Sequence, residues 1–453
     1  MLPLSTNVRL QILPCPPRAD THGWHSTSGR MPDKGEVTVM EVVHQRCAGL
    51  DISKSDAKLC VRTPGSRHRT FDKKVTVWGS FSNEVARLRE HLIAEGVSLV
   101  VMEATGDYWK PFLYRLQDCP FEVMLVNARH AKNLPGRKTD VSDAQWLAEL
   151  GAHGLVRASF VPPQPIRELR QLTRSRTIFT AERARESQRL EKLLEDSGIK
   201  LSSVATQITG VSGRAILAAL ISGERDPAVL ADLAKGRLRV KIPALVQALT
   251  GTFTEQHAFM AATHLDHIDR LTVTITAITA RIAMVLGPFH AAVDLLVTIP
   301  GVSQIIAEIV IAETGADMSR FPTAAHLASW AGVCPGHNES AGRVKSTRPR
   351  PGNSYLKGAL GIASMAAART NGTFFQARYK RLAVRRGEMK ALVAVEHSMI
   401  TAIWHMLSNN RPYHDLGHDH FDNINPGRER RRAIAKLTQL GYDVTLTPTG
   451  SSA

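Results

Sequence analysis

The chain has 453 residues, of which 43% are hydrophobic and 22% are charged. This length predicts two or three domains, and 57 Lys and Arg against 41 Asp and Glu indicate a polyanionic partner. No apolar run is long enough to span a bilayer, so we favour nucleic acid over a membrane. The five cysteines are scattered without CxxC spacing, which fits a reduced cytoplasmic protein and excludes a disulfide framework and a cysteine-based zinc site.

Residues 1–44 are predicted to be a disordered extension. Residues 1–14 lack the basic head and apolar core of a secretory signal. Residues 15–36 are rich in Pro, Gly, His, Ser and Arg and have no hydrophobic period. Because Met40 lies just before the first predicted strand, we interpret the preceding residues as a dispensable extension or an overlong reading frame.

Residues 45–160 alternate apolar runs with amphipathic segments, which predicts an α/β domain. The expected strands are 47–52, 57–62, 69–77, 98–103 and 122–126, and the expected helices are 82–95, 108–118 and 140–153. Three strands in a meander followed by alternating helix and strand give a mixed sheet of five. That is the element order of a ribonuclease H-like (RuvC-like) nuclease domain.

Four carboxylates lie where such a domain would place a site. Asp51 and Glu103 each end an apolar run interpreted as a buried strand, so both would project from strand ends. Asp140 and Asp143 open the last predicted helix at a spacing that puts them on one face, with Thr139 or Asp140 as the N-cap. Four acids brought together require a compensating cation, and hard oxygen ligands suit Mg²⁺.

Each acid also has a purely structural interpretation. A single Asp after a strand is usually a turn or cap residue, and Glu103 could simply face solvent. Asp140 and Asp143 could do no more than cap a helix and complement its dipole. Their order and context together favour the metal site.

Residues 165–290 are predicted to form a helical, coiled-coil domain. Pro162, Pro163 and Pro165 interrupt the preceding pattern and predict a linker. A charge-laced helix over 167–194 follows, and a second long helix has a heptad-like seam that indicates an antiparallel coiled coil or helical pair. The seam consists of Leu265, Ile268, Leu271, Ile275, Ile278, Ile282 and Val285. It fits an intramolecular hairpin and an oligomer contact equally well.

Residues 291–410 are predicted to form a mostly α-helical domain. Pro300-Gly301 joins two apolar segments, which predicts a helix-hairpin-helix offering backbone N–H groups to a phosphate; the alternative is an ordinary helical turn. Further on, twelve Lys and Arg between residues 337 and 390 face only two Glu. Their interleaved Tyr and Phe favour nucleic-acid binding over a solvated face.

The residues expected to contact nucleic acid are Lys138, Pro300, Gly301, Arg343, Lys345, Arg348, Arg350, Lys357, Arg385 and Arg386. Residues 411–453 are interpreted as a C-terminal tail. The His and Asp residues of the tail have no orderly ligand spacing, so no metal site is expected there.

Five motifs occur in a distinctive order along the chain: GLDISK at 49–54, MEATG at 102–106, KTDVSDA at 138–144, IPGV at 299–302 and NES at 338–340. Together they strongly resemble the DEDD transposases of the insertion sequence 110 family. The resemblance implies an RuvC-like N-terminal domain, a coiled-coil insert and a C-terminal transposase domain. It matches Asp51, Glu103, Asp140 and Asp143 to the metal-binding acids of the family, and Ser340 to its catalytic serine.

The resemblance further implies an enzyme that recombines a mobile element site-specifically through a circular intermediate. In that family a noncoding bridge RNA pairs with donor and target DNA. Base pairing would then carry specificity while the protein holds nucleic-acid backbones. We accordingly expect a homo-oligomer, dimer or tetramer, in the prokaryotic cytoplasm at the nucleoid.

A serine nucleophile would form a phosphoserine linkage that preserves bond energy for rejoining, whereas water would lose it. The family often has Ser-Gly-Gly or Ser-Gly-x-Ser after the Glu, but Ser340 here precedes Ala341-Gly342, which keeps Ser346 as an alternative nucleophile. Because the helical insert separates Ser340 from the acids in sequence, the site must be composite, from one subunit or from two.

Two other functions compete with recombination. A hydrolytic, structure-specific nuclease of the Holliday-junction-resolvase type would use the same acids and basic surface but no serine. A non-enzymatic nucleic-acid scaffold would need neither the four acids nor the serine. However, four acids in a basic protein weaken DNA binding unless metal occupies them.

Overall fold

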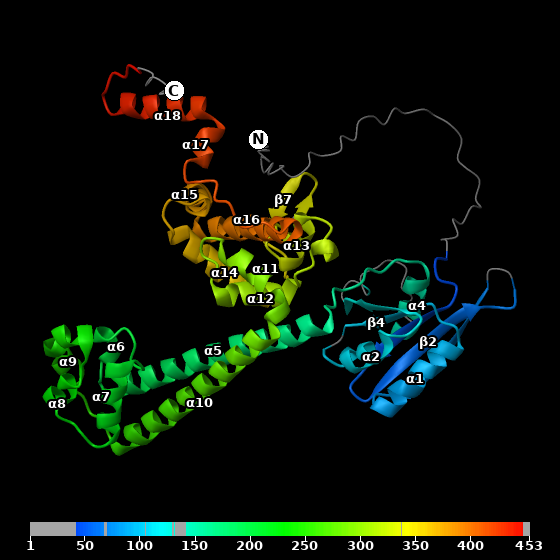
Figure 1. Cartoon of the computed structure of the whole chain (residues 1–453), viewed down its shortest axis with the longest axis horizontal. Coiled ribbons are helices and arrows are strands. Elements are labelled where there is room, and N and C mark those ends of the chain that lie inside the picture. Colours follow the sequence, from blue (N-terminus) through cyan, green and yellow to red (C-terminus); the bar gives the residue numbers. More distant parts are fainter. Residues whose placement is uncertain are drawn as a thin grey trace, which may run out of the picture. The chain divides into compact units, whose positions relative to one another are not determined.

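The computed structural model describes residues 42–67, 70–104, 106–128, 131, 142–336 and 338–446. The chain divides into two compact units, one ending at Ser159 and the other beginning at Phe160 (Figure 1). Residues 1–41 of the expected extension lie outside the described residues. The expectation is wrong for Val43 and His44, because both backbone N–H groups donate to the carbonyl of Ala152 in the first unit.

The first unit contains a five-stranded sheet. Its strands are β1 (Cys47–Ile52), β2 (Asp56–Pro64), β3 (Phe71–Gly79), β4 (Leu99–Glu103) and β5 (Glu122–Val126). Their spatial order is β3-β2-β1-β4-β5. β1 and β3 run antiparallel to β2, whereas β4 is parallel to both β1 and β5. This mixed sheet agrees with the predicted meander and is compatible with a ribonuclease H-like domain.

Three described helices accompany the sheet: α1 (Ser82–Ala94), α2 (Trp109–Leu116) and α4 (Asp143–Ala152). α4 packs on β1, β2 and β4 and shares a core with Cys47, Leu99 and Val101. The strands and helices of this unit lie within a few residues of the predicted bounds. Buried strand runs and amphipathic helices therefore carried enough signal to locate them.

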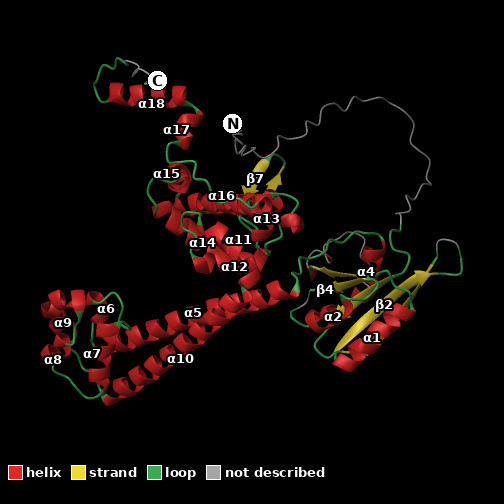
Figure 2. Ribbon diagram, in the orientation of Figure 1, coloured by secondary structure: helices red, strands yellow, loops and turns green. Residues whose placement is uncertain are grey.

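The second unit is helical except for one small hairpin (Figure 2). Two long helices, α5 (Gln164–Asp196) and α10 (Glu255–Val285), form an arm. The tip of the arm consists of the short helices between them: α6 (Leu201–Val204), α7 (Val211–Ile221), α8 (Pro227–Asp232), η1 (Gly236–Lys241) and α9 (Ile242–Ala248). The rest comprises η2 (Gly287–Phe289), α11 (His290–Val297), α12 (Gln304–Thr314), η3 (Met318–Arg320), α13 (Ala324–Ala331), β6 (Asn338–Ser340), β7 (Arg343–Ser346), α14 (Ser354–Arg369), α15 (Phe374–Arg386), α16 (Glu388–Asn409), α17 (His420–Ile424) and α18 (Pro426–Gln439).

α5 and α10 form an antiparallel pair. The start of α5 and the end of α10 share one core, with Leu169 and Ile282 buried, whereas the end of α5 and the start of α10 share another, with Leu194 and Ala261 buried. All seven residues of the predicted seam are buried or half-buried. The helical pairing is thereby confirmed, while coiled-coil packing and the split into domains 165–290 and 291–410 stay predictions.

The linker prediction is wrong for Pro165. α5 begins at Gln164 with Pro163 as its N-cap, so Pro165 lies in the first helical turn. Proline is tolerated there because the first N–H groups of a helix have no partner inside the helix. Pro163 therefore caps α5 and Pro165 belongs to it, whereas Pro162 precedes the helix, shortly after the junction of the two units.

The segment after Asn409 is more ordered than a simple tail. Tyr413, Leu416 and Phe421 pack against the core of the second unit, and Asp415 Oδ1 accepts a hydrogen bond from the N–H of Phe374, 2.9 Å away. The tail interpretation is thus wrong for its first part, because its aromatic residues complete an apolar core. Among the described residues no single helix is long and apolar enough to cross a bilayer; α10 and Gly287–Val297 meet that requirement only as a pair bent by 65°.

Candidate active site

Asp51 and Glu103 lie side by side at the carboxyl ends of two parallel strands. The last residues paired between β1 and β4 are Leu50 and Met102, and Asp51 and Glu103 follow them directly. Residues in register on parallel strands face the same side of a sheet. Glu103 is buried, at 6% exposure, and Asp51 is half-buried. The sheet therefore brings the two carboxylates to one end of one face, as predicted.

α4 covers that same face and approaches it unusually closely. A side chain at Gly49 would place its Cβ 2.5 Å from the backbone nitrogen of Ala148 and closer still to the carbonyl oxygen of Ala144. At the other end of α4, a Cβ on Gly151 would lie 2.8 Å from Cys47 Sγ. Since Gly49 and Asp51 are two residues apart on β1, both face α4. The helix therefore starts near the Asp51 end of β1.

Asp143 is the first residue of α4, so this close packing brings the third carboxylate to the same end of the sheet. The N-cap is Ser142, whose side chain forms a capping box with Gln145. The predicted N-cap at Thr139 or Asp140 is wrong, because α4 begins at Asp143 and Ser142 caps it. Lys138 and Asp140 lie outside the described residues, and the sequence Ser-x-x-Gln was an available capping signal.

The donor set is chemically suited to a hard divalent cation, since all its side-chain ligands are carboxylate oxygens. Within residues 42–67, 70–104, 106–128, 131, 142–336 and 338–446, no three His, Cys, Asp or Glu side chains are grouped closely enough to hold a metal ion. Asp51, Glu103 and Asp143 thus converge on one end of the sheet without forming a closed ligand set by themselves. The fourth predicted ligand, Asp140, is not among the described residues.

A partly buried ion cluster fixes α4 to the sheet. Glu149 Oε2 lies 2.7 Å from Lys73 Nζ and 3.5 Å from Nε of Arg62, which is almost fully buried and stacks on Phe71. Burial alone raises the pKa of Glu149, but the hydrogen bond and charge of Lys73 and the charge of Arg62 outweigh it and lower this pKa below its usual value. Glu149 therefore stays ionised and clamps the helix that carries Asp143.

Ser340 ends β6, directly before the two-residue turn of the β6–β7 hairpin. It pairs with Arg343, and Ala341 and Gly342 between them have φ values of 49° and 75°. Two successive positive φ values are typical of a type I′ turn. Ser340 is exposed, and its hydroxyl makes no hydrogen bond to another described residue. Sequence analysis missed this hairpin because Ala-Gly is a weak turn signal compared with Asn-Gly.

Ser346 differs from Ser340 in both position and partners. It ends β7 and is half-buried, and its Oγ accepts a hydrogen bond from the N–H of Arg348 at 3.2 Å. A hydroxyl that caps its own loop is less available as a nucleophile than an exposed one. The local geometry therefore favours Ser340 over Ser346.

The predicted nucleic-acid-binding residues of the second unit have different environments. Arg343, Lys345, Arg348 and Arg350 are exposed on β7 and the following loop, and Arg385 and Arg386 are exposed in the last turn of α15. Lys357 is half-buried on α14, and its charge partly offsets the burial that raises the pKa of Glu396. Arg343, Lys345, Arg348 and Arg350 thus form an exposed basic stretch on and directly after β7, while Arg385 and Arg386 are exposed at the end of α15.

Pro300-Gly301 does connect two helices, α11 and α12, but it packs inside the unit. Gly301 has a φ of 87°, and a Cβ there would lie 2.6 Å from the backbone nitrogen of Ala367 on α14. Backbone conformation and close packing thus both require glycine. The helix-hairpin-helix and its contact with phosphate stay predictions, because this packing explains Gly301 without a ligand.

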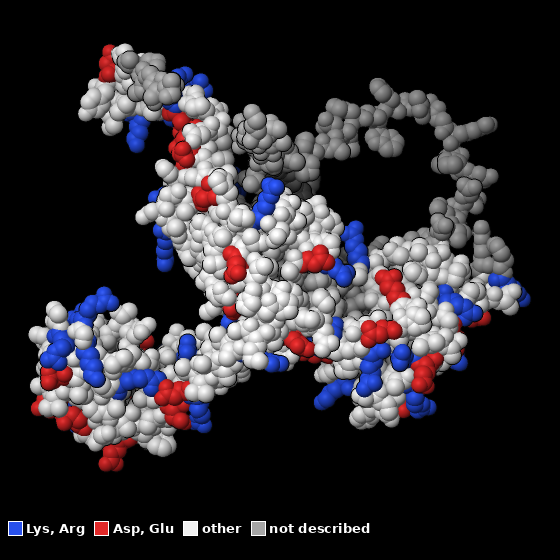
Figure 3. Space-filling view, viewed as in Figure 1, with Lys and Arg blue, Asp and Glu red and all other residues white. Residues whose placement is uncertain are grey.

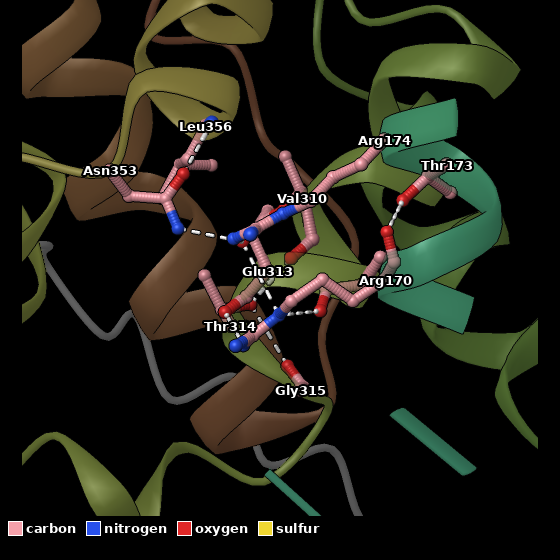
Figure 4. Close-up of polar contacts among 10 residues, drawn as sticks. Arg170, Thr173, Arg174, Val310, Glu313, Thr314, Gly315, Asn353 and Leu356 are labelled. Carbon is pink, nitrogen blue, oxygen red and sulfur yellow. Dashed lines mark hydrogen bonds and ion pairs between the residues drawn. The ribbon is translucent and has the colours of Figure 1, made fainter. Parts of the chain in front are cut away.

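A buried glutamate that the sequence did not reveal joins the arm to the loop after the serine hairpin (Figure 4). Glu313 of α12 is fully buried and accepts two hydrogen bonds from Arg174 of α5, at 2.7 and 2.8 Å. Arg170 lies 3.3 Å from the same carboxylate and donates to the carbonyls of Ala312 and Glu313. Asn353, the N-cap of α14, donates to Glu313 Oε2 at 2.6 Å.

This network anchors the end of the basic loop. Asn353 follows the loop directly, and its N–H also donates to the carbonyl of Trp330. At the start of the basic loop, the carbonyl oxygen of Thr347 accepts a hydrogen bond from the N–H of Gly336. No sequence motif indicated Glu313, because a glutamate inside an apolar helix is paired only by residues distant in the chain.

Comparisons with known proteins agree with this architecture. Residues 48–198 match a transposase family model of the DEDD IS110 type, and residues 293–380 match one described as transposase of the IS116/IS110/IS902 family. An uncharacterized 43.6 kDa protein of insertion element IS110 from Streptomyces coelicolor is 26% identical over 81% of this chain and 94% of its own length. A pilin gene-inverting protein of Moraxella lacunata is 22% identical over 82% and 98%, respectively.

A third relative, the uncharacterized 42 kDa protein of insertion element IS900 from Mycobacterium paratuberculosis, is 25% identical over 61% of this chain and 73% of its own length. The mixed sheet, its converging acids and the two family matches define a transposase, an enzyme that acts on DNA. The chain belongs to the IS110 family of transposases. A DEDD domain of this type implies dependence on a divalent metal ion.

Proposed function

We propose that this transposase is an RNA-guided, site-specific DNA recombinase with a serine nucleophile. The observation that carries the proposal is the convergence of Asp51, Glu103 and Asp143 on one end of the sheet in a chain that also exposes the Ser340 hydroxyl on a hairpin. Asp140 is proposed as the fourth acid. The similarity of this chain to an insertion-element protein and to a pilin gene-inverting protein agrees with both features.

Asp51, Glu103, Asp140 and Asp143 would hold Mg²⁺ through carboxylate oxygens. When bound, the ion would neutralise charge on a DNA phosphate and favour ionisation of a nearby hydroxyl. The Gly49 contact and the Glu149 clamp orient Asp143 relative to the sheet, so the protein fixes these ligands before substrate binds. Ordering ligands in advance lowers the reorganisation needed during reaction.

Ser340 would attack the scissile phosphate through Oγ. A bond from Oγ to phosphorus forms, a phosphorus–oxygen bond to one deoxyribose breaks, and that sugar oxygen leaves as a hydroxyl after taking up a proton. The resulting phosphoserine ester retains the energy needed to join the strand to a new sugar hydroxyl. Exposure of Ser340 and its lack of a hydrogen bond to described residues support this role.

Arg343, Lys345, Arg348 and Arg350 would hold the DNA backbone beside this hydroxyl, and Arg385 and Arg386 at the end of α15 would be further backbone contacts. Lys138, Pro300, Gly301 and Lys357 remain predicted contacts. Backbone binding without base readout leaves sequence recognition to a guide, which we propose to be a noncoding bridge RNA pairing with donor and target DNA. The acids and the serine would come together in a homo-oligomer, dimer or tetramer, or within one chain.

The decisive experiment compares Ser340→Ala, Ser346→Ala and Asp51→Asn by covalent capture on labelled DNA carrying the element ends. We expect Ser340→Ala to abolish both the protein–DNA adduct and strand exchange, and Ser346→Ala to retain them. Asp51→Asn should prevent adduct formation by removing a metal ligand. Cleavage that persists in Ser340→Ala without an adduct would support the competing junction-resolvase type of nuclease.

A second measurement tests the guide. Nucleic acid recovered with the purified protein should contain one discrete noncoding RNA encoded beside the gene. RNA drawn evenly from the whole transcriptome would reject RNA guidance while leaving the serine mechanism open to the first experiment.

A further inference from the structure

The far end of the helical arm carries a basic turn that the proposed reaction does not use. η1 (Gly236–Lys241) joins α8 to α9, and four cations lie between residues 235 and 241 with no acid among them: Lys235, Arg237, Arg239 and Lys241. All four residues are exposed. Figure 3 shows Lys and Arg gathered on the visible surface of the tip, over α6 and α9. Like charges crowded in one turn favour an anionic ligand.

Internal partners neutralise only part of this charge. Arg239 lies 3.2 Å from Asp232 and also donates to backbone carbonyls, and Lys241 Nζ donates to the carbonyl of Val204 at 3.0 Å. Lys235 and Arg237 form no ion pair with a described residue. Two cations are therefore held in place by the tip itself, and two are available for an external anion.

The turn is attached to a packed core rather than hanging in solvent. Ser212 Oγ accepts a hydrogen bond from the Lys235 N–H at 2.9 Å and donates to the Lys235 carbonyl at 3.4 Å. Beside this contact lies an open cavity of about 400 Å³ whose lining includes Thr206, Gln207, Ser212 and Lys235. The core beneath buries Leu217, Leu230 and Leu245. A turn whose backbone is held this way loses little backbone entropy when it binds.

The arm also sets how far the turn lies from the serine-bearing core. Leu169 of α5 is buried in that core and Leu194 in the tip, so the two cores are separated by 25 residues of one continuous helix. At 1.5 Å per residue this is about 37 Å. The same length corresponds to roughly eleven base pairs of duplex DNA at 3.4 Å each.

We propose that the arm tip binds the phosphate backbone of duplex DNA flanking the exchange site, without reading its sequence. Lys235 and Arg237 would each contact a phosphate, while Arg239 and Lys241 maintain the turn and its positive potential. DNA is the partner we choose because a transposase must handle duplex on both sides of the strands it exchanges. The role is additional to the proposed serine chemistry and does not depend on it.

The test measures binding of the full-length protein to a 40-base-pair random-sequence DNA duplex over a range of salt concentrations. The test variant is Lys235→Gln/Arg237→Gln. The matched control is Lys192→Gln/Arg281→Gln, which removes the same charge from exposed positions on α5 and α10. Unfolding temperatures of both variants verify folding, and a 40-base-pair RNA duplex is measured in parallel.

We expect the slope of log K against log salt to decrease by about 2 in the test variant, since each lost phosphate contact removes about 0.9. The control should keep the wild-type slope. Equal decreases in both variants would reduce the effect to net charge and overturn the proposal. An unchanged slope in the test variant, or a decrease seen only with RNA, would overturn it as well.

Discussion

The acids and the candidate serine are held in opposite ways. Asp51, Glu103 and Asp143 lie on two buried strands and the start of a helix that touches the sheet backbone. Ser340 lies at the exposed tip of a short hairpin, and its position depends on two turn residues and on anchors at the ends of the loop. The proposed metal ligands must keep their mutual geometry, whereas the proposed nucleophile, which would be joined to DNA and later released, must be reachable.

This difference shows which residues should be sensitive to mutation. Around the acids, a single added methyl group can disturb the site because helix and strand backbones are in contact. Around the serine, side chains can change freely provided that turn geometry and the loop anchors persist. Four changes test this contrast, beginning with the largest expected effect.

Glu313→Ala removes the carboxylate that anchors the basic loop and leaves Arg170 and Arg174 without their buried partner. We expect a loss of about 3–5 kcal/mol in the stability of the second unit, the usual cost of breaking a buried ion pair. Hydrogen exchange in α4 of the first unit should stay unchanged. Glu313→Gln, which keeps the shape, should cost less, and faster exchange in α4 would show that the two regions are not independent.

Gly49→Ala places a methyl group against the backbone of α4. Overpacking of this kind costs about 1–3 kcal/mol, and the displaced helix should carry Asp143 away and slow strand cleavage. Differential scanning calorimetry and a cleavage assay measure the two effects. Gly358→Ala on α14 is the control, because nothing lies within 4 Å of its added Cβ; equal losses in both variants would argue against close packing as the cause.

Ala341→Gly and Gly342→Ala form a matched pair in the serine hairpin. Ala341 already occupies the left-handed region, so glycine there should relieve strain by up to about 1 kcal/mol. Alanine at 342 should add about 1–2 kcal/mol of backbone strain because φ there is 75°. No clash adds to this strain, since no atom lies within 4 Å of the added Cβ. Hydrogen exchange at β6 and β7 should slow in the first variant and accelerate in the second. Identical exchange in both would mean that the turn does not hold Ser340.

Acidification should loosen α4 through Glu149. The pKa of this carboxyl is lowered in the folded protein, so the stability it contributes is complete above its ordinary value of 4.5. That contribution is lost as the pH falls through the lower folded pKa. Hydrogen exchange of α4 measured from pH 6 down to pH 3 should show the loss, and Glu149→Gln should remove this part of the pH dependence. If Glu149→Gln kept the pH dependence of hydrogen exchange seen in the wild type, Glu149 would not be the residue that holds α4 to the sheet.

Local patterns were sufficient for most elements and for the places of three acids on those elements. Apolar runs located β1 and β4 and put Asp51 and Glu103 at their ends, while the motif around Asp143 marked the start of α4 to within three residues. The β6–β7 hairpin escaped detection because its strands are short and its turn residues are atypical. A glycine within an apolar strand is a general signal of close backbone approach, but it does not say which element approaches.

The sequence by itself determined the kinds of chemistry available: carboxylates at strand ends, a basic C-terminal region, a long helical arm and the motifs of a transposase family. Those features depend on residue identity and on neighbours close in the chain. Only the tertiary structure decided that α4 touches β1 at Gly49, that Glu313 joins the arm to the loop after Ser340, and that Gly301 packs on α14. Such contacts join residues far apart in sequence, and periodicity carries no information about which distant partner a buried charge or a glycine will meet.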